Sequence, residues 1–305
     1  MTDAADRLLR RVKSLKTYRR GDRRAPHKPL LLLVAIGQLL QGHSRLNFSE
    51  VQERLLPLLK AYAPPVAARH QPELPYWHLQ SDELWEVDGA SKFPRQQGNF
   101  PRMDAIRRSS AGLPKADAEL LRSDPRVVEQ VIKVLLDAHF PASVHEDLLS
   151  AVGLATDMPT ESATKSVAPL SRDPAFRQAV LRAYEHRCAF SGFRAALHGS
   201  YFGCEAAHVQ WHAFAGPDVV ANGIALEPTI HKLFDAGAWS LTDDRRIIVS
   251  ANYTGSDAAV RRLREQHGKV LGSPLPGEPP VAPEFIRWHR EATLGGVFRE
   301  PALPL

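Results

Sequence analysis

Residues 204–237, CEAAHVQWHAFAGPDVVANGIALEPTIHKLFDAG, constrain the fold more than any other stretch of the chain. Two short apolar runs, CEAAHV and GIALEP, are predicted to be strands on either side of a loop that contains Gly216 and Pro217. The segment TIHKLFDAG is predicted to be a helix, with Thr229 as its N-cap and Gly237 as its stop. The stretch therefore predicts a strand, a loop, a strand and a helix in succession.

Two histidines lie near the ends of these predicted elements: His208 is at the end of the first predicted strand, and His231 is near the helix start. Hydrolysis of a phosphodiester needs an activated water and positive charge where negative charge develops on the phosphate. A histidine can be the base because its unperturbed pKa is about 6.5. A divalent cation held by a second ligand can be the Lewis acid. The two histidines are candidates for these two roles.

The spacing of three polar residues is specific: Asn222 follows His208 by fourteen residues, and His231 follows Asn222 by nine. This pattern resembles the HNH nuclease motif. EAAHV, the GPD loop, NGIAL and HKLFDAG resemble the HNH domains of McrA-type restriction endonucleases over about residues 173–250. The resemblance implies a ββα-metal fold in which His208 is the general base, Asn222 fixes the loop that presents it, and His231 binds the metal.

The residue before His208 departs from that pattern. Many HNH enzymes carry an Asp or His there as a second metal ligand, whereas this chain has Ala207. Asp235 lies one helical turn after His231 and is predicted to supply the missing ligand. Glu205 is the weaker candidate, because its placement depends on local strand geometry. The resemblance implies a divalent metal cofactor, with Mg²⁺ or Mn²⁺ favoured.

Composition describes a globular protein, with 44% hydrophobic and 24% charged residues. The only two cysteines, Cys188 and Cys204, make neither a disulfide framework nor a four-thiolate zinc site, and we expect both to be small buried residues. His212 is expected to be a loop histidine. No apolar run approaches the roughly 20 residues of a membrane span, and the N-terminus has no secretory signal. We therefore expect a cytoplasmic protein with no membrane partner.

The first half of the chain carries a concentrated positive charge. Between Arg7 and Lys28 there are ten Lys or Arg residues and one acid, Asp22, in a chain of net charge +5. Residues 5–18 have the spacing of an amphipathic helix, and a second helix is predicted from Pro29 after the loop YRRGDRRAPHKP. Such a cluster indicates either a polyanionic partner or a solvated helix face.

Three further segments organise this half. Ser49 and Gln52 resemble a capping box ahead of VQERLLPLLKAY, and LPYWHLQSDELWEV predicts two short strands or a hairpin. Ser123, Asp124 and Pro125 are predicted to cap the helix RVVEQVIKVLLDAHF.

The segment from 152 to 170 consists mainly of small and polar residues and contains proline, which predicts a linker. After it we expect a helix in DPAFRQAVLRAYEHR and a hairpin in WSLTDDRRIIVS. The predicted class is α+β: a mixed helical and short-sheet recognition domain at 1–150, a linker at 151–171 and a ββα-metal nuclease domain at 172–305.

RRAPHKPLLLL and LPYWHLQSDELWEV resemble the sulfur-binding domain that precedes HNH in McrA-like type IV restriction enzymes, over about residues 5–140. The resemblance implies recognition of double-stranded DNA with a phosphorothioate backbone, through an apolar pocket with a basic rim. Sulfur is a weaker hydrogen-bond acceptor than oxygen, so an apolar wall suits it. The pocket candidates are His27, Lys28, Pro75, Tyr76 and His78. The candidates for phosphates or base edges are Arg19, Arg20, Arg23, Arg24, Arg95 and Arg102.

The function that these features predict is a type IV restriction endonuclease that cuts phosphorothioated DNA. One alternative is an HNH endonuclease that recognises methylated or hydroxymethylated cytosine, which would need a deep aromatic pocket for a flipped base. Another is a DNA-binding regulator without catalysis, which Ala207 keeps open. Cutting two strands with one active site per chain favours a homodimer.

Overall fold

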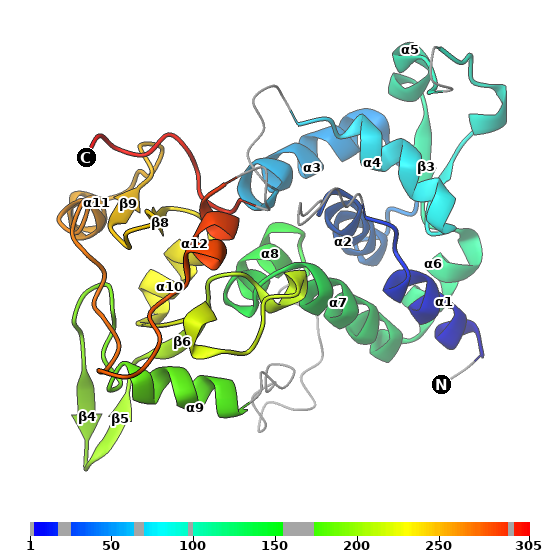
Figure 1. Ribbon diagram of the computed structural model, residues 1–305. Coiled ribbons are helices and arrows are strands. Elements are labelled where there is room, and N and C mark those ends of the chain that lie inside the picture. Colours follow the sequence, from blue (N-terminus) through cyan, green and yellow to red (C-terminus); the bar gives the residue numbers. More distant parts are fainter. Residues whose placement is uncertain (1–2, 18–25, 64–69, 97–99, 155–173, 292–295) are drawn as a thin grey trace. The chain divides into compact units, whose positions relative to one another are not determined.

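The computed structural model describes residues 3–17, 26–63, 70–96, 100–154, 174–291 and 296–305 (Figure 1). It divides into two compact units. The first contains the described residues up to 139 and from 145 to 154, and the second contains residues 140–144 and the described residues from 174 onward. Most of the predicted linker lies outside the described residues, so its bounds stay a prediction.

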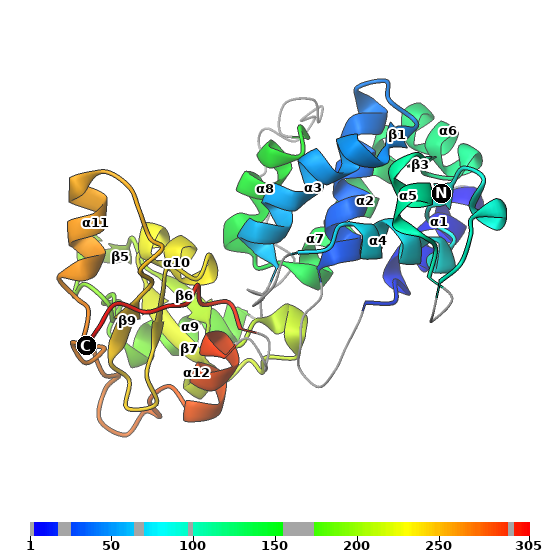
Figure 2. The same ribbon diagram turned by 90° about the horizontal axis from the view of Figure 1, so that it is seen from above.

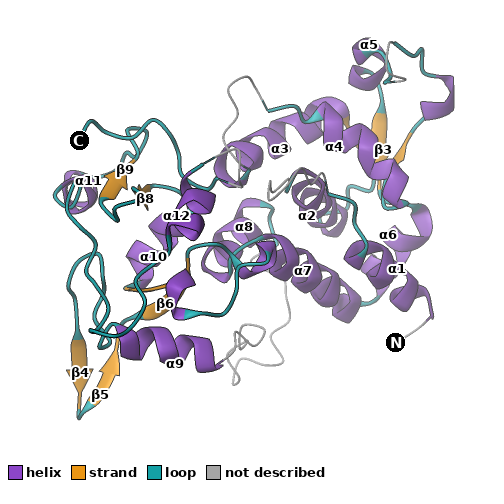
Figure 3. Cartoon of the chain, in the orientation of Figure 1, coloured by secondary structure: helices purple, strands orange, loops and turns teal. Residues whose placement is uncertain are grey.

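The first unit is mainly helical, with one small sheet (Figure 3). Its helices are α1 (Asp3–Lys13), α2 (His27–Leu40), α3 (Phe48–Tyr62), α4 (Glu73–His78), α5 (Met103–Arg107), α6 (Lys115–Ser123), α7 (Pro125–His139) and α8 (His145–Ala151). Its strands are β1 (Leu46–Asn47), β2 (Glu86–Val87) and β3 (Ser110–Gly112), which pair antiparallel in the order β1-β3-β2.

Helix α2 is the centre of this unit (Figure 2). It is apolar on all sides, and its residues from Pro29 to Leu39 are buried. A helix that is hydrophobic all round must be enclosed by other elements, and α3, α4, α6 and α7 all contact it. Gly37 allows one especially close approach, because a Cβ there would lie 2.1 Å from the carbonyl oxygen of Val152.

Two local predictions for this unit are wrong. The segment LPYWHLQ forms α4 and a 3-10 turn, η1 (Leu79–Asp82), instead of a strand, whereas the second predicted strand is present as β2. Tyr76 and Leu79 are buried three residues apart, and this helical spacing cannot be told from alternation over so few residues. Helix α3 begins after Asn47, whose backbone N–H donates to Glu50, so the capping box lies two residues before the predicted one.

The predicted start of α7 is confirmed. The helix begins at Pro125, and Asp124 accepts a hydrogen bond from the backbone N–H of Arg126 at 3.0 Å. The first predicted helix is also present, as α1, with its apolar side buried.

The second unit combines short helices with three two-stranded sheets. Its helices are α9 (Pro174–Ala183), α10 (Pro228–Asp235), α11 (Asp257–Arg264) and α12 (Pro283–Arg290), with 3-10 turns η5 (His212–Phe214) and η6 (Val220–Asn222). Its strands are β4 (Ala195–Leu197), β5 (Ser200–Phe202), β6 (Glu205–His208), β7 (Gly223–Leu226), β8 (Trp239–Leu241) and β9 (Ile247–Val249). The two units together confirm the α+β class.

The predicted strand, loop, strand and helix are confirmed as β6, the loop, β7 and α10, and the predicted hairpin after them is β8–β9. The predicted cap is wrong: α10 is capped at Glu227, with Pro228 in the first helical turn, so Thr229 already lies inside the helix. Gly237 follows the helix with φ +77°, as a stop residue should. The hairpin β4–β5 was not predicted.

Helix α9 packs against the β6–β7 hairpin. His208 pairs with Gly223 at the end of the two strands. A Cβ at Gly223 would lie 2.3 Å from Val180 of α9, so glycine is what lets the helix approach the hairpin this closely. None of the helices in the described parts of the chain combines the length and the apolar character that a membrane span requires.

Candidate functional site

His208 is the last residue of β6, and its buried ring is held from two sides. Its Nε2 lies 2.7 Å from Oδ1 of Asp218, in the loop before η6. Its ring stacks on Phe176 of α9, with centroids 4.0 Å apart and planes inclined by 17°. Asp218 was not among the predicted site residues. It belongs to the GPD loop, and residue spacing alone could not show that this loop lies close to His208.

Asn222 is buried, and its side chain binds only backbone. Its Oδ1 accepts from the N–H of Gln210 at 2.8 Å, and its Nδ2 donates to the carbonyl oxygens of Gln210 and Pro217, both at 3.0 Å. Gly216 passes close to the Asn222 amide and to the Gln210 backbone. A Cβ at Gly216 would lie 3.0 Å from Nδ2 of Asn222 and 1.9 Å from the Gln210 oxygen. Asn222 therefore ties both ends of the 210–217 loop to the start of β7.

His231 projects from α10 and is buried between two carboxylates. Its Nδ1 lies 2.8 Å from Oε2 of Glu205, and its Nε2 lies 3.1 Å from Oδ2 of Asp235. Burial alone would lower the pKa of His231, but the charges and hydrogen bonds of Asp235 and Glu205 outweigh it and raise the pKa to about 9. The imidazole is therefore held as a cation that donates to both carboxylates.

Asp235 is fixed from a second side by the loop that follows His208. Its Oδ1 accepts a hydrogen bond from Nε1 of Trp211 at 2.9 Å. Burial would raise the pKa of Asp235, but the charge of His231 prevails and lowers it, so the carboxylate stays ionised. Trp211 thus connects the loop after β6 with the helix that carries His231.

Glu205 is more important in this geometry than the sequence indicated. Side chains two residues apart on a strand share a face, so Glu205 lies on the same face of β6 as Ala207. It therefore provides a carboxylate on the face where the HNH pattern would have its second ligand. The two-residue period of the predicted strand was the signal that could have ranked it first.

The donor set around His231 suits a divalent cation, because carboxylates are ligands of Mg²⁺ and Mn²⁺ and imidazole is a ligand of transition-metal ions. Across the described residues, no group of three or more His, Cys, Asp or Glu side chains is arranged as a complete metal site. The side chain of Glu205 is 43% exposed, whereas that of Asp235 is 1% exposed. Glu205 is therefore the more accessible of the two carboxylates that contact His231.

The two cysteines are both buried and free. Burial, with Cys188 nearby, raises the pKa of Cys204 to about 11, so its thiol stays protonated. A protonated buried thiol is neither a metal ligand nor a reactive nucleophile.

The predicted recognition residues of the first unit lie partly in its core and partly at its surface. Tyr76, a predicted pocket residue, lies in the core, where its hydroxyl group is 2.9 Å from Oγ of Ser109, and Pro75 is buried as well. Arg102 is exposed and pairs with Asp104 at 3.1 Å. Four of the predicted cations lie outside the described residues: Arg19, Arg20, Arg23 and Arg24.

Helix α4 turns a different pair of side chains outward. Leu74 and His78 are four residues apart, so they share a face of the helix, and both are exposed. Burial, together with the charge of Lys28, lowers the pKa of His78 below its usual range. The ammonium of Lys28 lies 2.5 Å from Asp82, and His27, beside it, has its ring 6.3 Å from that of His70. Leu74 was missed because the segment was predicted to be a strand.

An aromatic cluster adjoins His78. Trp77 stacks on Phe93, with centroids 5.9 Å apart, and the guanidinium of Arg95 lies 4.8 Å over the Trp77 ring. The ring of Phe100 lies 5.7 Å from that of His78. Because these residues come from α4 and from the segment between β2 and α5, sequence spacing could not bring them together.

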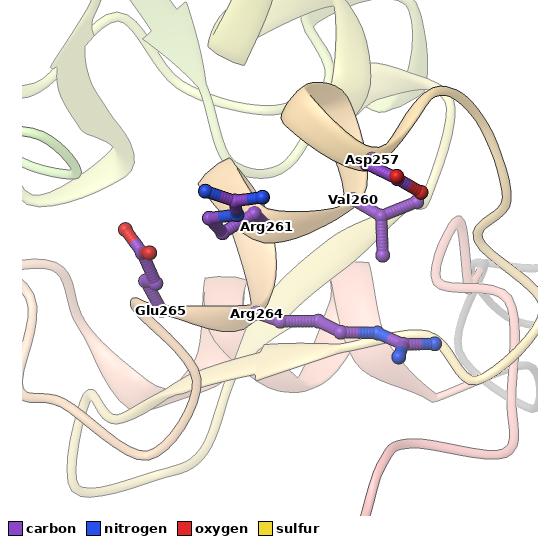
Figure 4. Close-up of a pocket in the computed structure, with 5 residues that line it drawn as sticks. All are labelled: Asp257, Val260, Arg261, Arg264 and Glu265. Carbon is purple, nitrogen blue, oxygen red and sulfur yellow. The ribbon is translucent and has the colours of Figure 1, made fainter.

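A hollow of about 450 Å³ on the second unit lies elsewhere (Figure 4). Its lining comes from α11 and the residue after it: Asp257, Val260, Arg261, Arg264 and Glu265. None of these is a residue of the HNH pattern, and we assign no part of the chemistry to this hollow.

Comparison with known proteins identifies both units. Residues 5–157 match the family "ScoMcrA-like, DNA sulfur-binding domain", and residues 188–242 match the HNH endonuclease family. No curated protein matches the chain.

Several solved structures are similar to the chain. The sulfur-binding domain of ScoMcrA complexed with phosphorothioated DNA is 30% identical, with 48% of this chain and 94% of that chain covered and a TM-score of 0.43. The corresponding domain of SprMcrA, also with phosphorothioated DNA, is 26% identical, with 51% and 98% covered and a TM-score of 0.42. The type IV phosphorothioation-dependent restriction endonuclease ScoMcrA is 27% identical, with 50% and 32% covered and a TM-score of 0.40.

The first of these family matches covers half of the chain, and the motif that begins at His208 falls within the second. The chain therefore belongs to the family of ScoMcrA-like DNA sulfur-binding domain proteins and joins that domain to an HNH endonuclease domain.

Proposed function

We propose that this protein is a modification-dependent endonuclease, which binds phosphorothioated DNA with its first unit and hydrolyses DNA with its second. The observation that carries the proposal is the presence of both family matches, to a DNA sulfur-binding domain and to an HNH endonuclease, in one chain. The similar sulfur-binding domains of ScoMcrA and SprMcrA have phosphorothioated DNA as their ligand, which supports the same ligand here.

His208 is the general base. Its Nε2 lies 2.7 Å from a carboxylate oxygen of Asp218, and as the base the imidazole takes a proton from the attacking water. The stack on Phe176 keeps the ring from turning. A base whose second nitrogen is bonded to a carboxylate is both oriented and stabilised when it becomes protonated.

Asn222 has a geometric role. Its three hydrogen bonds all end on the backbone of the loop that follows His208, so it holds that loop in place. This role does not require a contact between Asn222 and the substrate.

His231 and Glu205 would hold a divalent cation, Mg²⁺ or Mn²⁺, once Nδ1 of His231 has lost its proton, and Asp235 positions His231 from its other nitrogen. When bound, such a cation would stabilise the negative charge of the scissile phosphate and of the leaving oxygen. Water and phosphate oxygens would supply its other ligands, because Mg²⁺ usually keeps several oxygen ligands from outside the protein.

Sulfur recognition belongs to the exposed face of α4, with the aromatic cluster beside it. Leu74 and the carbon faces of His78 and Trp77 offer a surface on which sulfur loses little hydration. Lys28 and Arg95 lie near it and can meet the neighbouring phosphates.

The experiment compares two duplexes of one sequence, with and without phosphorothioate, incubated with the full chain and Mg²⁺ or Mn²⁺. We expect cleavage of the modified duplex only. His208→Ala should lower the cleavage rate by roughly 10²–10⁴-fold without weakening binding, because it removes proton transfer alone. His212→Ala is the matched control, since this exposed histidine lies close by, with ring centroids 6.1 Å apart.

Each element of the proposal can fail separately. Equal cleavage of both duplexes would contradict sulfur recognition. Preferential cleavage of a methylated duplex would show that the first unit recognises methylated DNA instead. Undiminished cleavage by His208→Ala would contradict the role of His208 as the base.

Cutting both strands of a duplex needs either two chains or two successive cleavage events by one chain. We propose a homodimer on DNA, which sedimentation of the complex tests.

A further inference from the structure

The β4–β5 hairpin projects from the second unit (Figure 1). Its strands pair only with each other, from Ala195 opposite Phe202 to Leu197 opposite Ser200. His198 and Gly199 at its tip both have positive φ, which is the backbone of a tight hairpin turn.

This ribbon concentrates exposed apolar side chains. Four large ones lie within ten residues: Phe193, Leu197, Tyr201 and Phe202. A two-stranded ribbon is marginally stable in water by itself, and contiguous exposed apolar groups usually mark an interaction surface. The ribbon therefore has the features of a surface that a partner covers.

The charge of the ribbon indicates which partner. From residue 186 to 204 there is no Asp or Glu, whereas Arg187 and Arg194 are both present. The guanidinium of Arg194 lies 4.6 Å over the ring of Tyr201, and His186 stacks on the same ring at 4.7 Å. Cationic and aromatic groups without an acid are complementary to a polyanion with stacked bases, which is nucleic acid.

The connection to the nuclease site limits where that partner lies. Phe202 ends β5, and His208 ends β6 six residues later. At about 3.4 Å per residue the two Cα atoms are at most roughly 20 Å apart. That distance equals about six base pairs of DNA, at ~3.4 Å each. A two-stranded ribbon also has the width that the major groove admits.

We propose that the β4–β5 ribbon enters the major groove of the substrate, with its base at Phe202 within about six base pairs of the phosphate that is cut. The inference rests on the proposed function, because it takes DNA as the substrate of the HNH site. The ribbon holds duplex DNA against the nuclease unit independently of sulfur, which the first unit recognises.

Photo-crosslinking tests the contact directly. The full-length Leu197→Cys variant is labelled with an azidophenacyl group and mixed with phosphorothioated duplex without added divalent ion, so the DNA stays intact. Both native cysteines are buried, which confines the label to the new thiol. Val270→Cys is the matched control, because Val270 is 56% exposed and Leu197 is 64% exposed in the same unit.

We expect the Leu197 label to crosslink to DNA several-fold more than the Val270 label. Equal yields from the two labels, or a crosslink between two protein chains in place of DNA, would overturn the proposal. Because this experiment needs no cleavage, it decides the ribbon's role even if the HNH site proves inactive.

A cleavage assay adds a functional readout. The double variant Leu197→Ser, Phe202→Ser changes two exposed side chains, so its thermal unfolding should match the wild type. We expect it to lower kcat/KM for the phosphorothioated duplex by about tenfold or more, as the loss of one good contact would, while the Kd for that duplex stays within about twofold. Unchanged kcat/KM in a wild type that cleaves would contradict the ribbon and leave the nuclease function intact.

Discussion

The HNH site and the α4 surface are built in opposite ways. At the HNH site most of the polar groups are buried, and most of their bonds join residues between 205 and 235. At the α4 surface the side chains are exposed or half-buried and come from segments as far apart as residues 28 and 100. A buried network depends on every member, whereas an exposed surface distributes its contacts. Chemistry should therefore be sensitive to single changes, and recognition should respond by degrees.

The largest effect is expected for Asn222→Asp, which keeps the shape of the side chain but removes both of its N–H donors. A carboxylate would then face the carbonyl oxygens of Gln210 and Pro217. We expect a loss of roughly 2–4 kcal/mol in unfolding free energy and at least about 100-fold in cleavage rate. Thermal unfolding and single-turnover kinetics measure both. Asn252→Asp is the control, because Asn252 is exposed and makes one such bond, to Glu300. A normal rate for Asn222→Asp would contradict the loop-fixing role.

Glu205→Gln tests the metal. The amide keeps a hydrogen bond to His231 but is a weaker ligand than a carboxylate. We expect the Mg²⁺ or Mn²⁺ concentration for half-maximal cleavage to rise about 10–100-fold, and chelation by EDTA to abolish cleavage of the wild type. Glu284→Gln, at an exposed position in the first turn of α12, should leave the metal dependence unchanged. If Glu205→Gln behaves like that control, the carboxylate is structural.

Leu74→Ser tests recognition. Removal of an apolar side chain from the surface proposed to face the sulfur should reduce the preference for modified over plain duplex by about tenfold, which is roughly the transfer free energy of one partly buried Leu. Binding to the plain duplex should hardly change. Leu40→Ser is a closely matched control, since Leu40 is 42% exposed and Leu74 is 39% exposed in the same unit. Equal effects of the two changes would place the sulfur elsewhere.

The smallest predicted effect is a pH dependence of binding. The pKa of His78 lies below its usual range because of burial and of Lys28, so this imidazole is neutral at pH 7. Protonation is favoured in the DNA complex, where phosphates are near, so affinity should rise as pH falls below about 6.5, by roughly twofold to fivefold. Fluorescence anisotropy against pH measures this. His78→Asn should flatten the profile, and an affinity that falls with acid would reverse the assignment.

Sequence alone could predict the elements that are close in the chain. The β6, β7 and α10 elements followed from spacing and from Gly237, and α7 followed from Asp124 and Pro125. The partnership of Asp218 with His208 could not be predicted, because a loop conformation decides it. The placement of Glu205 could have been predicted from strand alternation. The α4 segment was predicted to be a strand, because it is too short for a helical period to be distinguished from strand alternation. The exposed position of Leu74 was missed for the same reason.

The pairing of His208 with Gly223 also determines which substitutions the catalytic strand can tolerate. Gly223 has no side chain, and Val180 and Phe176 fill the space where its Cβ would lie, at 2.3 and 3.2 Å. Phe176 is the ring on which His208 stacks. A single methyl group at this position would push that ring away from His208. Under the proposed function, position 223 thus affects activity through packing alone, which a search confined to ionisable residues would never sample.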